Sequence, residues 1–199
     1  MVKSRNGVRV FALLATLLAT LTTSCVVGQA RAGTFAATSV RTDAAIAVEG
    51  EYLSGRSLTV VCARTEQDWT QALTAVGLPS AQADKYYGFS LISQGVMHLS
   101  PYVCDGLRFG TVASMRASHP FQVAWSVDVL VHESVHMGRF SSDEALAEAC
   151  ARVSLPVELH RLYGLAYHSA EMSRLTLAAA WFRGTQPAAY HGGTCTPVA

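Results

Sequence analysis

One five-residue pattern, His132-Glu133-Ser134-Val135-His136, lies in an apolar run that begins at Val127. Pro120 suits the first turn of a helix, and the run after it predicts a helix from about Phe121 to Met137. Two histidines four residues apart share one helix face, so both imidazoles can reach one metal ion, and Glu133 can address a water on that metal. Unpaired polar groups in an apolar helix cost roughly several kcal/mol, which a bound zinc ion would offset. The pattern therefore predicts a zinc-binding helix.

The first 32 residues carry the three parts of an export signal. These parts are the basic Lys3, Arg5 and Arg9, the apolar core Val10 to Leu21, and the small-x-small site Ala30-Arg31-Ala32. We expect cleavage after Ala32. Two alternatives remain open: lipid attachment at Cys25, and retention of residues 8–27 as a membrane anchor. All three interpretations place residues 33–199 outside the cytoplasm, either secreted or attached to the outer face of the membrane.

Composition and charge limit the class of partner. The chain of 199 residues is 50% hydrophobic and 15% charged, which indicates one compact domain rather than a disordered chain. Four of its 15 basic residues lie in the first 32 positions, which contain no acid. The remainder has 11 basic and 14 acidic residues, a net charge near −3. We therefore expect no nucleic-acid partner, and we expect a monomer.

The cysteine count agrees with export. Apart from Cys25, the chain has four cysteines, and an even number in an exported protein favours two disulfides. We prefer Cys62 with Cys104 and Cys150 with Cys195, because each pairing keeps the bridge within one half of the chain. The other pairings, and buried free thiols, remain open.

The stretches before the motif predict a linker followed by a small sheet. Residues 33–55 are small, polar and weakly periodic, as expected of a linker or lead-in to a domain at 56–199. The remaining elements are a strand at Leu58 to Ala63, a helix at Glu66 to Val76, two hairpin strands at Tyr86 to Ile92 and Val96 to Leu99, and a short helical turn capped by Ser100-Pro101.

Helices fill most of the chain after the motif. Gly138 is expected to end the motif helix in the left-handed conformation. The next helix should begin at a cap provided by Ser141 or Ser142 and end near Leu155, before Pro156. We expect a last long helix at about Val157 to Phe182 and a coil from Gly184, held in place through Cys195.

A second pattern follows the first. Residues 144–151 read EALAEACA. With H-E-x-x-H, this segment resembles the gluzincin type of zinc metallopeptidase, in which E-x-x-A-[DE]-x-x-A occupies the helix after the motif. The resemblance covers about residues 121–151 and implies that Glu144 is the third zinc ligand, while Glu148 orients a ligand histidine. The alternative makes Glu148 the ligand and places Glu144 in a capping box with Ser141. The metzincin extension is absent.

The resemblance also implies a fold and an activity. The fold would be a small α+β, zincin-like domain, with a short antiparallel sheet packed on the active-site helix and a mainly helical C-terminal part. Substrate, a peptide or protein, would lie along an edge strand. Val96 to Leu99 looks like this strand, and His98 within it either faces the cleft or is simply solvated.

The implied reaction is zinc-dependent peptide hydrolysis, with Glu133 as the general base for the attacking water. The group that stabilises the oxyanion is unassigned. Four downstream side chains are candidates for it: Tyr163, Tyr167, His168 and His191.

A different class of function stays open. The chain could be a non-catalytic exported binding or scaffold domain, with structural zinc or none, whose partner is an envelope or extracellular protein. In a structural zinc site, protein ligands usually fill all four coordination positions, often with cysteine. Glu133 would then have no catalytic role.

Overall fold

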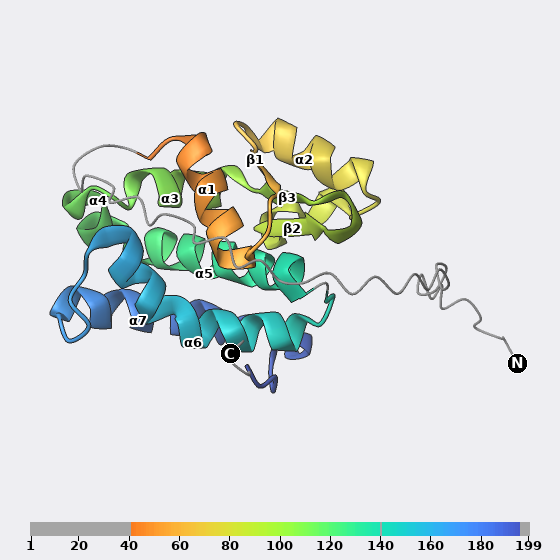
Figure 1. The fold of residues 1–199 in the computed structure, drawn as a ribbon. Coiled ribbons are helices and arrows are strands. Elements are labelled where there is room, and N and C mark those ends of the chain that lie inside the picture. The colour runs from red at the N-terminus through yellow and green to blue at the C-terminus, as the bar shows by residue number, and fades with distance from the viewer. Residues whose placement is uncertain (1–40, 140, 196–199) are drawn as a thin grey trace, which may run out of the picture. The chain divides into compact units, whose positions relative to one another are not determined.

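The computed structural model describes residues 41–139 and 141–195, and these form a mostly helical unit with one small sheet (Figure 1). This agrees with the expected α+β class. The helices and strands are α1 (Asp43–Ser54), β1 (Thr59–Cys62), α2 (Glu66–Ala75), β2 (Gly88–Leu91), β3 (Val96–Leu99), α3 (Pro101–Phe109), α4 (Ala113–Ser118), α5 (Pro120–Arg139), α6 (Glu144–Tyr163) and α7 (Ala170–Arg183). Three short 3₁₀ turns complete the path: η1 (Ser80–Lys85), η2 (Ile92–Gln94) and η3 (Ala188–Tyr190).

The sheet is mixed, so the expectation of an antiparallel sheet is wrong for one of its three strands. The order is β1-β3-β2, with β3 in the centre. The predicted hairpin is present: β2 and β3 are antiparallel, and Gly95 turns the chain between them with a φ of 69°. β1 pairs with β3 in parallel. A parallel neighbour needs a crossover connection, and the segment that contains α2 supplies it.

Helix α5 is the centre of the unit. It packs against α1, α3, α6 and α7, and β2 also lies against it. Almost every residue from Val123 to Met137 is buried. The expectation that Gly138 ends this helix in the left-handed conformation is wrong, because Gly138 lies within the helix and does not have a positive φ. A Cβ at Gly138 would lie 2.6 Å from the carbonyl oxygen of Ser54, so this glycine is needed for the close approach of α1.

The predicted linker is wrong for the residues that form α1. Thr42 caps this helix at its start, and Gly55 ends it in the left-handed conformation. Ile46 is fully buried, and a Cβ at Gly50 would lie 3.0 Å from Cγ2 of Val60. The helix is built largely from small residues that pack closely, so it lacks the large apolar repeat that predicts a helix. Residues 33–40 lie outside the described residues.

Two predicted helix boundaries after the motif are also wrong. Helix α6 begins after Asp143, whose side chain accepts a hydrogen bond from the Leu146 amide, rather than after Ser141 or Ser142. It continues through Pro156 and ends at Gly164, where φ is 69°. A proline inside a helix costs about 3 kcal/mol, which burial of apolar side chains on both sides of it offsets here. The expected last helix is therefore the end of α6 followed by a separate α7.

Both preferred disulfides are present. Cys62–Cys104 joins β1 to α3, and Cys150–Cys195 joins α6 to the C-terminal segment. Two disulfides indicate an oxidising, extracellular environment. In the described part of the chain, no helix has the length and apolar character needed to cross a bilayer. The predicted export signal at 1–32, with its alternatives at residues 8–27 and Cys25, lies outside the described residues.

Removal of the second bridge is expected to destabilise the fold. In Cys150→Ser/Cys195→Ser, the unfolded chain regains the freedom of a loop that spans a sequence separation of 45. The free energy of unfolding should fall by about 4 kcal/mol. Chemical denaturation measures this loss in a protein that keeps the Cys62–Cys104 bridge, with the m-value fitted separately for each variant because the freer unfolded chain exposes more surface. A loss below about 1 kcal/mol would contradict the expectation.

Candidate metal centre

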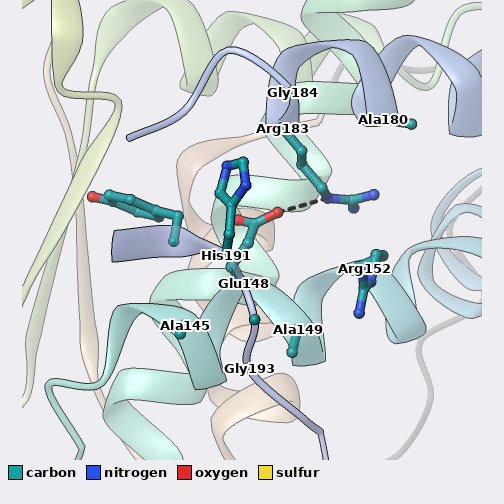
Figure 2. A pocket seen from close by; sticks show the side chains of 11 residues that line it. Ala145, Glu148, Ala149, Arg152, Ala180, Arg183, Gly184, His191 and Gly193 are labelled. Carbon is teal, nitrogen blue, oxygen red and sulfur yellow. Dashed lines mark ion pairs between the residues drawn. The ribbon is translucent and has the colours of Figure 1, made fainter. Parts of the chain in front are cut away.

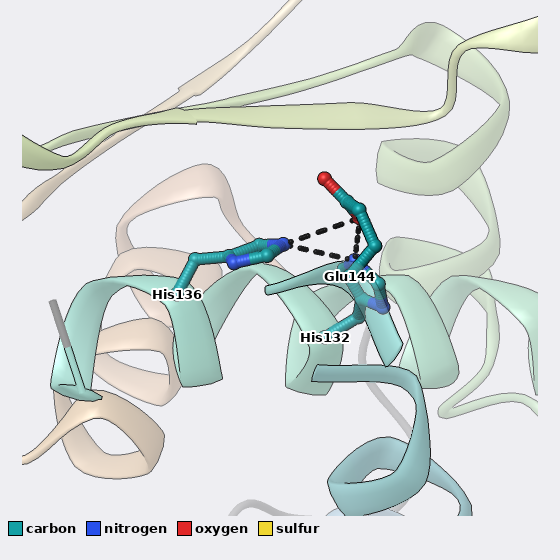
Figure 3. Close-up of side chains that lie close together, drawn as sticks. All are labelled: His132, His136 and Glu144. Carbon is teal, nitrogen blue, oxygen red and sulfur yellow. Dashed lines mark hydrogen bonds and ion pairs between the residues drawn. The ribbon is translucent and has the colours of Figure 1, made fainter. Parts of the chain in front are cut away.

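The two histidines of the motif lie one turn apart on α5, and their rings converge (Figure 3). The two Nε2 atoms are 3.1 Å apart, and both residues are buried. Nδ1 of His136 lies 2.6 Å from the carbonyl oxygen of Ser141, so Nδ1–H donates to that oxygen. This hydrogen bond leaves Nε2 of His136 available to a metal ion.

Glu144 completes the cluster from the first turn of α6. Its Oε2 lies 3.0 Å from Nε2 of His132 and 3.4 Å from Nε2 of His136. The short connection after α5 brings α6 back across α5, so the three side chains meet although eight positions separate His136 from Glu144. Glu144 makes no capping box with Ser141, because Asp143 caps the helix.

The geometry of this cluster fits a zinc ion. Two ligand atoms of a tetrahedral zinc ion, each about 2.0–2.1 Å from it, lie about 3.3 Å from one another. The three separations in the cluster, 3.0, 3.1 and 3.4 Å, are close to this value. Two imidazole nitrogens and a carboxylate oxygen are also donors that zinc prefers. The cluster could therefore hold a metal ion.

The charges of the cluster shift the pKa values of its members. Burial lowers the pKa of His132, but hydrogen bonds to Glu144 and Glu148 outweigh burial and raise this pKa to about 10. Burial likewise raises the pKa of Glu144, but its hydrogen bonds to the two histidines lower it to about 2. In the metal-free protein at neutral pH, His132 is therefore protonated and Glu144 is ionised. A metal ion must displace the proton of His132, so metal affinity should rise with pH.

Glu148 lies behind His132 rather than in the cluster. Its Oε2 is 3.5 Å from Nδ1 of His132, and its Oε1 is 2.7 Å from Nε of Arg183 at the end of α7. Arg183 also forms an ion pair with Asp128, one turn before His132 on α5. Arg183 therefore holds the Glu148 carboxylate that faces the far nitrogen of His132, and Asp128 in turn pairs with Arg183.

Glu133 is buried on the side of α5 that faces strand β2. Ser90 Oγ donates a hydrogen bond of 2.8 Å to Oε2 of Glu133. A Cβ at Gly88 would lie 2.9 Å from Cγ of Glu133, so only glycine allows this contact. Burial raises the pKa of Glu133. The carboxylate is thus positioned by β2 and is not part of the histidine cluster.

The strand beside Glu133 is β2, and the expectation for Val96 to Leu99 is wrong. That segment is β3, which is paired on both sides, whereas one edge of β2 has no partner strand among the residues that the structure describes. His98 pairs with Phe89 and stacks on it at 4.6 Å, and Phe89 also contacts Trp69 of α2. Because successive side chains alternate between the two faces of a strand, His98 faces away from Glu133.

Two cavities adjoin the cluster, with volumes of about 50 and 250 Å³. One contains His132 and Asp128 in its lining, and the other contains His136 and Glu144. They share Tyr86, Gly88, Glu133 and Tyr190. Glu133 and the cluster therefore both border space that a ligand can enter.

No protein-family model, curated protein or solved structure matches this chain.

The residue that sequence reasoning missed is Tyr190 on η3. Its ring lies 5.7 Å from that of His132, and its side chain hydrogen-bonds to Glu144. Burial and the charges of Glu144 and Glu133 raise the pKa of Tyr190. One signal could have indicated it: Tyr190 is five positions from Cys195, whose predicted partner Cys150 lies on the helix that begins at Glu144.

None of the four expected oxyanion candidates lines the two cavities. The ring of Tyr163 lies near the guanidinium groups of Arg41 and Arg116, and Tyr167 stacks on His160. His168 is exposed in the turn before α7. His191 lines a different cavity, between α6 and α7 (Figure 2).

Proposed function

We propose that this protein is a zinc-dependent peptidase of the gluzincin type, with His132, His136 and Glu144 as ligands. The observation that carries the proposal is the convergence of three ligand atoms at separations of 3.0–3.4 Å. Glu133, on the same helix as the two histidines, accepts a hydrogen bond from Ser90 and is not one of the three. A metal site that only stabilised the fold would not need this separate carboxylate. The zincin-like interpretation of the fold rests on α5, the free strand β2 beside it, and the following helix that carries Glu144.

The donor set favours a catalytic site over a structural one. Three protein ligands leave a fourth position for water or substrate, whereas structural zinc sites are filled, often by cysteine. All four cysteines in the described part of the chain are in disulfides, so none of them is available to zinc. This observation weighs against the alternative of an exported scaffold domain with structural zinc.

The residues of the site can be given roles in peptide hydrolysis. A bound zinc ion supplies Lewis acidity, which acidifies water and polarises a peptide carbonyl. Glu133 accepts a proton from the attacking water and returns it to the leaving amine, and its raised pKa suits both steps. The free edge of β2 can hold an extended peptide by main-chain hydrogen bonds. Tyr190, which lines both cavities at Glu133, would donate a hydrogen bond from its hydroxyl to the oxyanion.

Tyr190→Phe tests this last role. Loss of one oxyanion donor should lower kcat about 100-fold, because the hydroxyl acts mainly in the transition state. Zinc content should stay near one ion per chain in the presence of excess zinc, although loss of the hydrogen bond to the ligand Glu144 should weaken zinc affinity. Steady-state kinetics and metal analysis measure both effects, and Tyr167→Phe is the matched control away from the site. A kcat within twofold of the wild type would remove Tyr190 from this role.

Ser90→Ala tests the position and charge of the base. Burial raises the pKa of Glu133, and the hydrogen bond from Ser90 opposes that rise. Without the hydroxyl, the pKa of Glu133 should rise further. Because the base must be deprotonated, the acidic limb of kcat/KM should move to higher pH. Ser93→Ala in the same hairpin is the control, and an unmoved or opposite limb would contradict the assignment.

The proposed function is tested by incubating purified protein with a mixture of unstructured peptides and identifying cleavage products by mass spectrometry. We expect cleavage with stoichiometric zinc, its loss after treatment with a chelator, and its return when zinc is added. Folded protein that binds no zinc would contradict the proposal. Protein that binds zinc and cleaves nothing would favour the binding or scaffold alternative.

A further inference from the structure

A third cavity, of about 420 Å³, lies between α6, α7 and the C-terminal segment (Figure 2). Its lining consists of small residues and a few long polar or aromatic ones. The small residues are Ala145, Ala149, Ala180, Gly184, Gly192 and Gly193. The larger residues are Glu148, Arg152, Arg183, Tyr190 and His191. The small residues leave space in the cavity, and only a few side chains bring polar groups to it.

The charge of the lining is not balanced. Glu148 is the only acidic residue in it, and Arg183 already forms an ion pair with this carboxylate. Arg183 is further paired with Asp128. Within residues 41–139 and 141–195, no carboxylate lies within ion-pair distance of Arg152. The guanidinium group of Arg152 therefore has no ion-pair partner among the described residues.

Two residues that line this cavity, Glu148 and Tyr190, also lie next to His132 of the metal cluster. Glu148 lies 3.5 Å from Nδ1 of His132, and the Tyr190 ring lies 5.7 Å from the His132 ring. Tyr190 also lines both cavities at Glu133. Glu148 and Tyr190 line both this cavity and the 50 Å³ cavity at His132, so the two cavities are neighbours.

We propose that this cavity binds a carboxylate group of the substrate, with Arg152 as the residue that recognises it. This inference rests on the proposed peptidase function. A guanidinium group matches the planar carboxylate with two parallel hydrogen bonds, and the small apolar residues accommodate the methylene groups of the same side chain. The carboxylate comes either from an acidic side chain or from the free end of the peptide.

Binding to the full-length Glu133→Gln protein, loaded with zinc, separates these sources. Four peptides of one sequence are compared by calorimetry: glutamate or glutamine at the variable position, each with a free or amidated C-terminus. We expect at least one carboxylate to tighten binding about tenfold. Arg152→Gln should abolish that preference, and Arg152→Lys should keep part of it. Arg174→Gln, which alters an exposed arginine of α7 outside this cavity, should keep all of it.

Equal binding of all four peptides would overturn the proposal, as would a preference that survives Arg152→Gln. Arg152 is exposed, so its replacement should not affect folding, and circular dichroism checks this. If the carboxylate preference is found while the wild-type protein cleaves none of these peptides, the cavity assignment stands and the peptidase function fails. The two failures are therefore distinguishable.

Discussion

Replacement of Glu133 by glutamine is expected to lower kcat/KM for peptide hydrolysis between about 100-fold and 10⁴-fold, the usual contribution of a general base. Glutamine has nearly the same shape but cannot accept the proton of the attacking water. Glu133 lies outside the cluster of His132, His136 and Glu144, so the zinc content should stay near that of the wild type. Kinetics with one defined peptide and metal analysis of the same sample measure both quantities.

Glu66→Gln is the matched control, because this carboxylate is exposed on α2. It should alter neither activity nor zinc content. Full activity of Glu133→Gln would remove this residue from the mechanism. Loss of zinc together with activity would instead indicate that Glu133 contributes to metal binding.

Glu144→Gln and Glu148→Gln should weaken zinc binding to very different extents. Glu144 brings its oxygen to within 3.0 and 3.4 Å of the two histidine nitrogens, so it acts as a ligand, and its loss should weaken zinc binding about 10³-fold. Glu148 faces the far nitrogen of His132, and loss of such a partner typically costs 10-fold to 100-fold. Competition with a chelator of known affinity measures both dissociation constants.

The comparison between these two variants decides which glutamate binds zinc. Each substitution keeps the volume of the side chain and removes one negative charge, so each variant is the control for the other. A larger loss of affinity in Glu148→Gln would contradict the assignment and favour the alternative in which Glu148 is the ligand. Thermal unfolding of both variants without metal separates a change in zinc affinity from a change in stability.

The parts of this protein that could be predicted from sequence depend on local spacing. A helix places residues four apart on one face, so His132 and His136 had to converge once the apolar run formed a helix. The pairing of Cys150 with Cys195 followed from keeping each bridge within one half of the chain. The hairpin of β2 and β3 likewise followed from two short strands around Gly95.

The parts that could not be predicted depend on contacts between distant segments. Gly138 looks like a helix end in sequence, but its lack of a side chain serves the approach of Ser54. Pro156 looks like a break, but packing on both sides keeps α6 intact. Tyr190 reaches the cluster because a disulfide ties the C-terminal segment to α6, and no periodicity in sequence reports this contact.

The central claim is that His132, His136 and Glu144 hold zinc with a fourth position open, and zinc X-ray absorption on the purified protein tests it most directly. The account predicts one zinc ion per chain, only nitrogen and oxygen ligands at about 2.0–2.2 Å, and outer-shell scattering from two imidazoles. Sulfur at about 2.3 Å, or a wild-type spectrum without two imidazoles, would contradict the account.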